Sequence, residues 1–88
     1  MKIFLSPKAE KQIKKLTKID QIIIAKKIRQ LINPPQNLNK EKISNYKDIF
    51  RVRVGDYRIV YRETKNEIYI ILIGHRKNIY SLLDQLLK

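Results

Sequence analysis

The chain has 88 residues, with 20 lysines and arginines against eight acidic residues and a formal net charge of +12 at pH 7. We expect one small domain over residues 1–88, with the apolar residues committed to its core. The absence of cysteine excludes a disulfide framework and a thiolate metal site, and it is typical of a cytoplasmic protein.

The excess of positive charge predicts an anionic partner. Nucleic acid, an acidic protein and a membrane surface all satisfy this condition, and we favour nucleic acid. The longest apolar runs, 22–25 and 68–73, are too short to cross a bilayer, and the first residues contain no signal-peptide core. We therefore expect no membrane partner.

The first third of the chain predicts a strand followed by a helical hairpin. The segment KIFLS is typical of a short strand. Ser6 can cap a helix in which Pro7 takes the first position, and this helix spans about 7–16. Asp20 is the expected N-cap of a second helix, which ends at Asn-Pro-Pro in 33–35.

The rest of the chain predicts three strands and a last helix. Residues 36–48 are interpreted as a polar connection. FRVRV and YRIVYR alternate around Gly55-Asp56, a two-residue hairpin turn with glycine at a position of positive φ. A second turn at Lys65-Asn66 leads into EIYIILIG, whose apolar residues on both faces indicate a central strand. The tail NIYSLLDQLLK has the apolar spacing of a helix.

The turn at Gly55-Asp56 predicts the register of the first hairpin. Arg53 should face Arg58, and one face of the hairpin should carry all of its arginines: Arg51, Arg53, Arg58 and Arg62. If the second hairpin keeps simple alternation, Val60 faces Ile71, Arg58 faces Ile73, and the tail covers both isoleucines. The same alternation puts His75 on the arginine face.

Two interpretations of the arginine face remain open. A solvated polar face is common in antiparallel sheets. The alternative is a phosphate site, because a guanidinium group donates two hydrogen bonds at once to a phosphate. Arginines that face each other across strands repel, by about 0.2–1 kcal/mol, and a bound anion would offset that cost. With one histidine and scattered carboxylates, we expect no metal or cofactor.

The segments YKDIFRVRVGDYRIVYR and IGHRKNIY resemble the RelE branch of the RelE/ParE superfamily of toxin–antitoxin toxins, over nearly the whole chain. The implied fold is α+β, a small two-layer domain in the order strand, helix, helix, strand, strand, strand, helix. Its sheet would be mainly antiparallel and four-stranded, in the order 1-4-3-2. The helical hairpin would cover one face, and a C-terminal helix would complete the domain.

The resemblance also implies a ribosome-dependent endoribonuclease that cuts mRNA in the ribosomal A site. Such an enzyme needs no metal, because the 2′-hydroxyl of the substrate attacks the adjacent phosphate. The implied catalytic residues in this sequence are Arg51, Arg53, Arg58, Arg76 and Tyr80. Arg58 would bind the scissile phosphate, Arg76 would clamp it or lie near the leaving group, and Tyr80 would stack on a base or assist proton transfer.

One departure from the family concerns the general base. Arg51 and Arg53 stand where the best-known members have lysine, and arginine stays protonated and is a poor base. His75 is a candidate for proton transfer, although a lone histidine is more often an ordinary surface or hydrogen-bonded residue. Tyr80 can likewise be read as an aromatic residue at the edge of the core.

Two other functions compete with the ribonuclease. A ParE-like inhibitor of DNA gyrase would use the same fold as a protein-binding surface. An inactive basic module would only bind nucleic acid. If the chain is a toxin, it needs a cognate antitoxin, and we expect that protein to carry an acidic segment.

Overall fold

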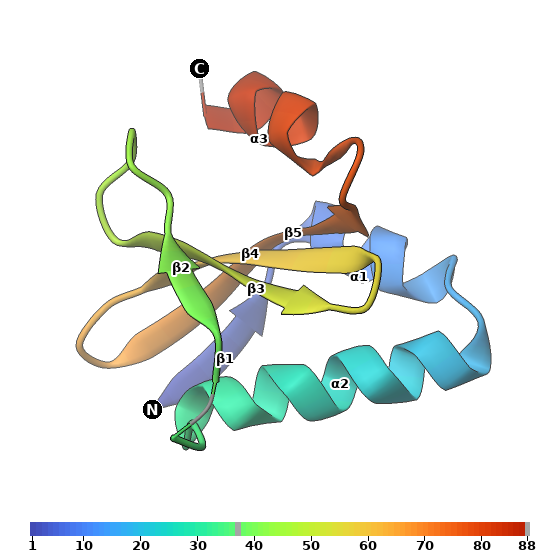
Figure 1. Cartoon of the computed structure of the whole chain (residues 1–88), viewed down its shortest axis with the longest axis horizontal. Coiled ribbons are helices and arrows are strands. Elements are labelled where there is room, and N and C mark those ends of the chain that lie inside the picture. Colours follow the sequence, from blue (N-terminus) through green and yellow to red (C-terminus); the bar gives the residue numbers. More distant parts are fainter. Residues whose placement is uncertain (37, 88) are drawn as a thin grey trace.

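The computed structural model of the protein describes residues 1–36 and 38–87 (Figure 1). Its elements follow the chain as β1 (Lys2–Leu5), α1 (Pro7–Lys14), α2 (Lys18–Ile32), β2 (Lys40–Lys42), β3 (Ile49–Val54), β4 (Tyr57–Glu63), β5 (Glu67–His75) and α3 (Ile79–Leu87). None of the described helices is long and apolar enough to cross a membrane.

The sheet differs from the predicted one. It has five strands in the order β1-β5-β4-β3-β2 and is mixed, because β1 runs parallel to β5. The expected four-stranded, mainly antiparallel sheet of order 1-4-3-2 is therefore wrong. The additional strand, β2, lies in the segment interpreted as a polar connection and pairs with the edge of β3. Three polar residues are too few to show a strand period.

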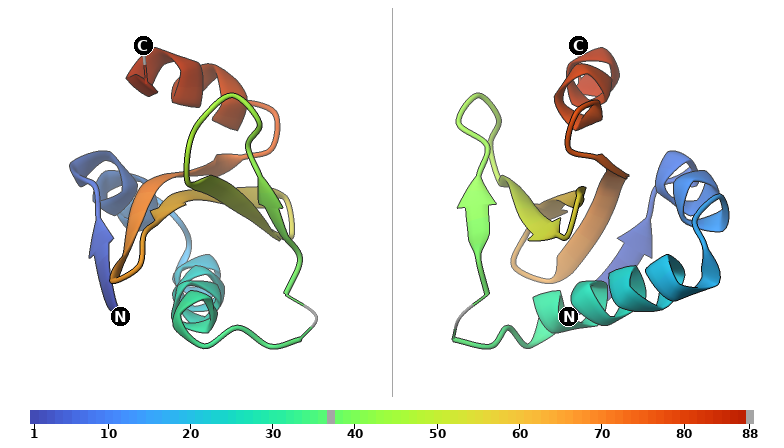
Figure 2. Two further views of the ribbon diagram at one scale, coloured as in Figure 1. Left: turned by 90° about the vertical axis from the view of Figure 1, so that its left-hand side faces the viewer. Right: turned by 45° about the vertical axis from the view of Figure 1, so that its right-hand side comes forward.

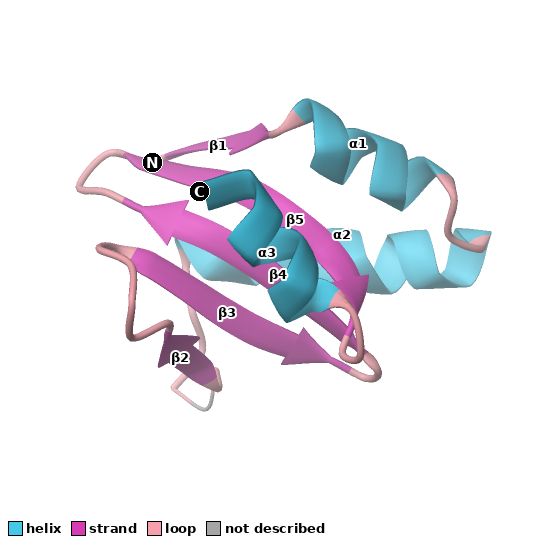
Figure 3. Ribbon diagram, turned by 90° about the horizontal axis from the view of Figure 1, so that it is seen from above, coloured by secondary structure: helices cyan, strands magenta, loops and turns pink. Residues whose placement is uncertain are grey.

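Helices cover both faces of the sheet. Figure 2 and Figure 3 show α1 and α2 on one side and α3 crossing β4 and β5 on the other. Each side has its own core. The core under α1 and α2 includes Ile24, Ile28, Ile59, Tyr61, Ile70 and Ile73. The core under α3 consists of Ile49, Val60, Ile71, Leu72, Ile79 and Leu83.

The first two helices begin at capped residues. Ser6 is the N-cap of α1, as predicted, and its hydroxyl accepts a hydrogen bond from the Ala9 amide at 3.0 Å. The N-cap of α2 is Thr17, not Asp20, and its hydroxyl accepts from the Asp20 amide at 3.2 Å. Asp20 therefore lies in the first turn, where its charge complements the helix dipole.

A β-bulge in β5 changes the predicted register of the last strand. Tyr61 pairs with Ile70, but Val60 pairs with Leu72, so Ile71 is an extra residue. Ile71 and Leu72 consequently both contribute to the core under α3, whereas Ile73 turns to the opposite core. The expected pairs Val60–Ile71 and Arg58–Ile73 are wrong, and α3 covers Ile71 but not Ile73.

Helix α1 replaces β1 along the outer edge of β5. Strand β1 ends opposite Ile70, which leaves the next peptide groups of β5 without a neighbouring strand. The Ser6 hydroxyl donates to the Ile71 carbonyl at 2.7 Å, and the Gln12 side-chain oxygen accepts from the Ile73 amide at 2.7 Å. These two side chains satisfy backbone groups on either side of Leu72.

Replacing Gln12 with alanine should destabilise the fold. The Ile73 amide would lose its partner in a part-buried position, and an unsatisfied buried donor costs about 1–3 kcal/mol. Urea unfolding of the variant measures this loss. The control is Gln85→Ala, at an exposed position of α3, which should change the free energy of unfolding by less than about 0.5 kcal/mol. Equal effects of both substitutions would contradict the role given to Gln12.

Candidate active site

The β3–β4 hairpin has the predicted register, which brings three of its arginines together. Arg53 pairs with Arg58, Val52 with Ile59 and Phe50 with Tyr61. Gly55 has a φ of +60°, while Asp56 is not among the residues with positive φ, which is the pattern of a type II′ turn. We call Arg51, Arg53, Arg58 and Arg76 the arginine cluster.

Backbone carbonyls at the turn hold the cluster in place. The Gly55 carbonyl accepts from Arg53 Nε at 3.2 Å and from Arg58 Nη1 at 3.4 Å. Arg58 Nη1 also donates to the Tyr57 carbonyl at 3.1 Å. Arg76 follows β5, and its backbone amide donates to the Asp56 carbonyl at 2.8 Å. One turn thus anchors residues from three different segments of the chain.

The electrostatics of Arg58 indicate a site for an anion. Partial burial lowers the pKa of its guanidinium group, and the charges of Arg53, Arg51 and Arg76 lower that pKa further. All three neighbours are therefore close enough to repel Arg58. An anion bound among these cations would remove the repulsion and restore some of the solvation that Arg58 has lost.

A carboxylate lies within this group of cations. Glu41 of β2 is opposite Arg51 in the sheet, and its Oε2 accepts a short hydrogen bond from Arg51 Nη2. A hollow of about 120 Å³ is lined by Asn39, Glu41, Arg51, Arg53 and Arg58. The hydrogen bond and charge of Arg51 lower the pKa of Glu41, so this carboxylate is ionised at neutral pH.

Asn39 and Glu41 are absent from the predicted site, because the strand β2 was not predicted. The signal available in the sequence was weak. Lys40 and Lys42 alternate with Glu41, but a polar strand of three residues at a sheet edge looks the same as a polar loop.

Tyr80 lies beside the arginine cluster, against Arg51. Its ring, 40% exposed on the first turn of α3, faces the guanidinium of Arg51, whose Cζ is 5.3 Å from the ring centroid. Arg62 does not join the cluster. It pairs with Ile49 at the other end of the hairpin and lines a separate hollow with Tyr69 and Leu86.

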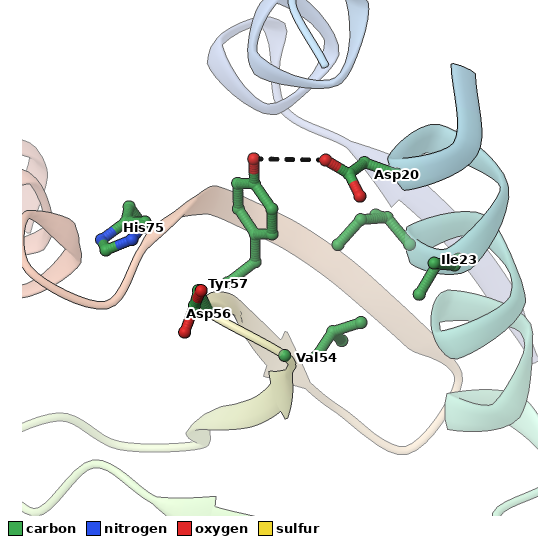
Figure 4. A pocket seen from close by; sticks show the side chains of 8 residues that line it. Asp20, Ile23, Val54, Asp56, Tyr57 and His75 are labelled. Atoms are coloured by element: carbon green, nitrogen blue, oxygen red, sulfur yellow. Dashed lines mark hydrogen bonds between the residues drawn. The ribbon is translucent and has the colours of Figure 1, made fainter. Parts of the chain in front are cut away.

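His75 lies on the opposite face of the sheet from the arginine cluster. The bulge at Ile71 shifts the alternation by one residue, so His75 pairs with Tyr57, which packs against the core under α1 and α2. The two rings meet edge to face, 6.3 Å apart. Figure 4 shows His75 beside Tyr57, in a hollow that Asp20 and Ile23 of α2 also line. The expectation that His75 shares the arginine face is wrong.

The acidic residues and the histidine do not gather into a metal site. Within residues 1–36 and 38–87, no group of three or more His, Cys, Asp or Glu side chains could hold a metal ion. The charged groups that share the small hollow are instead three arginines and one glutamate. The three guanidinium groups can bind a phosphate, and the carboxylate can accept a proton.

Known toxins resemble this chain in sequence. Residues 3–80 match the family model described as "ParE toxin of type II toxin-antitoxin system, parDE". The protein Toxin RelE3 of Methanocaldococcus jannaschii is 35% identical over 66 residues, which cover 66% of this chain and 75% of the relative.

Solved structures of toxins resemble this chain in fold. A chain of the RelB–RelE antitoxin–toxin complex from Methanococcus jannaschii matches with a TM-score of 0.74 and 26% identity, over 90% of this chain and 96% of that chain. YafQ from Escherichia coli BL21(DE3) matches with a TM-score of 0.72 over 89% of this chain and 96% of that chain. Its identity is 19%, so this second likeness concerns the fold alone.

Pyrophosphate should stabilise the protein through the arginine cluster. Binding of an anion to the folded state raises the melting temperature, by about 4–8 °C for each kcal/mol in a small domain. Arg58→Ala should remove most of this rise, whereas Arg29→Ala, an arginine in the last turn of α2, should keep it. Thermal unfolding with and without pyrophosphate makes the comparison. An equal rise in both variants would mean that the anion binds elsewhere.

Proposed function

This chain is a RelE-type toxin of the RelE/ParE superfamily of type II toxin–antitoxin systems, and we propose that it is an endoribonuclease that cuts mRNA on the ribosome without a metal ion. The observation that carries the proposal is the small hollow in which Glu41 lies among Arg51, Arg53 and Arg58. It combines cations for a phosphate with a proton acceptor.

The reaction joins the 2′ oxygen of one nucleotide to the adjacent phosphorus and breaks the bond from phosphorus to the 5′ oxygen. A base takes the 2′ proton, and the leaving oxygen gains one. The products are a 2′,3′-cyclic phosphate and a free 5′-hydroxyl. Negative charge grows on the phosphate oxygens in the transition state, so cations already held in place stabilise it.

The arginines divide these tasks by position. Arg53 and Arg58 hold the oxygens of the scissile phosphate, because both guanidinium groups are fixed at the Gly55 carbonyl. Arg76, anchored at Asp56, clamps the phosphate on the side of the leaving group. Tyr80 offers its exposed ring to a neighbouring base, since aromatic side chains stack on single-stranded RNA.

Glu41 is the general base in this proposal, in place of His75. Without substrate, its hydrogen bond to Arg51 lowers its pKa, which makes it a weak base. A bound phosphate competes for Arg51, and loss of that hydrogen bond raises the pKa of Glu41 towards its ordinary value. Substrate binding would thus make the carboxylate a better proton acceptor when it is needed.

Two partners belong to the proposal. Ribosome-bound mRNA would be the substrate, which places the toxin in the cytoplasm. Solved relatives include antitoxin–toxin complexes, and by analogy this toxin has a cognate antitoxin. Because the chain has a net charge of +12, an acidic segment of that antitoxin would bind the basic surface and block the arginine cluster.

A gyrase inhibitor is the second candidate, because the matching family model carries the name of the ParE toxin. A protein-binding inhibitor would have no use for a glutamate among phosphate-binding arginines. The two functions differ in what they damage, either messenger RNA or chromosomal DNA.

Induction of the toxin in reporter cells should produce new mRNA 5′ ends, confined to translated regions and in register with codons. Arg58→Ala and Arg76→Ala should each reduce the cutting about 10²–10³-fold, because each removes a cation from the growing charge. Arg29→Ala should cut like the wild type. DNA damage without new 5′ ends would favour gyrase, and undiminished cutting by a folded double variant would refute the assigned site.

Glu41→Gln should lower cutting about 10²–10⁴-fold, the usual contribution of a general base. RNA binding should stay equal or become tighter, because glutamine no longer competes for Arg51. Glu63→Gln is the matched control, since Glu63 forms an ion pair with Lys40 from the same strand as Glu41 but does not line the hollow. Weaker RNA binding by Glu41→Gln, with cutting reduced only in proportion, would exclude the role of Glu41 as a base.

A further inference from the structure

A second hollow lies behind the hairpin turn, on the face covered by α1 and α2. It has a volume of about 330 Å³ and is lined by Asp20, Ile23, Ile24, Val54, Gly55, Asp56, Tyr57 and His75 (Figure 4). The mechanism above uses none of these side chains. In a chain with only eight acidic residues, two carboxylates line this one hollow.

The hollow combines aromatic rings with a hydrogen-bond acceptor. Tyr57 and His75 lie edge to face, and both are only partly exposed. The Tyr57 hydroxyl donates to Asp20 Oδ2 across a long 3.5 Å contact, and Figure 4 shows the Asp20 carboxylate directed at that hydroxyl. A carboxylate accepts about four hydrogen bonds, so Asp20 can accept from a ligand as well.

A basic groove lies beside both this hollow and the arginine cluster. The groove, of about 400 Å³, is lined by Ile23, Lys26, Lys27, Gln30, Arg53, Val54 and Gly55. It shares Ile23, Val54 and Gly55 with the second hollow. It shares Arg53 with the small hollow that holds Glu41. Consecutive depressions therefore share lining residues around the Gly55 turn, and we refer to the three together as the path.

We propose that the second hollow is a subsite for one nucleobase of the single-stranded RNA that flanks the scissile phosphate, and that Asp20 selects bases with an exocyclic amino group. The RNA would leave the arginine cluster along Arg53, with its phosphates beside Lys26 and Lys27. The inference rests on the proposed ribonuclease function and adds to it a determinant of sequence preference.

The chemistry of the hollow favours a base over a peptide. Asp20 and Asp56 would repel an acidic antitoxin segment, and the lysines of the groove would repel a basic peptide. A nucleobase is neutral and planar, and single-stranded bases bind aromatic side chains while side chains read their hydrogen-bonding edges. Adenine, cytosine and guanine present an amino group to a carboxylate, whereas uracil has none.

The first test maps cut sites for the wild type and for Asp20→Asn. The wild type should disfavour uracil at one fixed position beside the cut, and the variant should weaken that bias about tenfold, because the asparagine amide both donates and accepts. Asp84→Asn is the matched control. Asp84 also accepts from a tyrosine, Tyr46, at 3.1 Å, but it lies outside the path. An unchanged base distribution in a folded Asp20→Asn variant would overturn the inference.

The second test needs no cleavage and separates this inference from the proposed function. Purified protein is titrated with short oligo(A), oligo(C) and oligo(U), and the ring signals of His75 are followed by NMR. Oligo(A) and oligo(C) should shift these signals and bind about tenfold more tightly than oligo(U); this result would support the subsite even if no mRNA were cut. Equal binding of all three, or His75 signals that respond only to an acidic peptide, would refute it.

Discussion

The outer edge of β5 is the constraint on which the rest of this small protein depends. Strand β1 covers only part of that edge, and Ser6, the N-cap of α1, and Gln12 of α1 supply hydrogen bonds beyond it. These two side chains satisfy peptide groups around Leu72, in the same stretch of β5 that carries the extra residue Ile71. The end of β5 determines where the chain continues, and Arg76, Tyr80 and α3 all follow it directly.

The arginine cluster shows how a repulsive arrangement of charges can be tolerated in a folded protein. Arg53 and Arg58 face each other across the two strands, and the cost of their repulsion is limited because both can donate to the Gly55 carbonyl. Arg51 instead has Glu41 on one side and the ring of Tyr80 on the other. In this site the charge of Arg51 is balanced by Glu41, whereas Arg53 and Arg58 donate only to backbone carbonyls among the side-chain hydrogen bonds described. In our proposal a phosphate binds Arg53 and Arg58 and competes with Glu41 for Arg51.

Sequence reasoning succeeded where a local signal determined the structure. Gly55 fixed the register of the first hairpin, and with it the pairing of Arg53 with Arg58. It failed where the deciding partner lay elsewhere in the chain. Nothing in EIYIILIG marks Ile71 as a bulge, since every neighbouring position is apolar. The side chains that bond to the backbone of this stretch, Ser6 and Gln12, lie far earlier in the chain. The same applies to β2, whose three polar residues become a strand only by pairing with β3.

The bulge also has a consequence for how such proteins can diverge. A β-strand exposes alternate residues on opposite faces, and a bulge accommodates one extra residue by placing two successive residues on the same face. Ile71 and Leu72 are these two residues, and both belong to the core under α3. Loss of the single codon for Ile71 would leave Ile70 opposite Tyr61 and Leu72 opposite Val60 in plain alternation, so His75 would stay opposite Tyr57. One codon can therefore be gained or lost in this core strand without moving His75 to the face of the arginines.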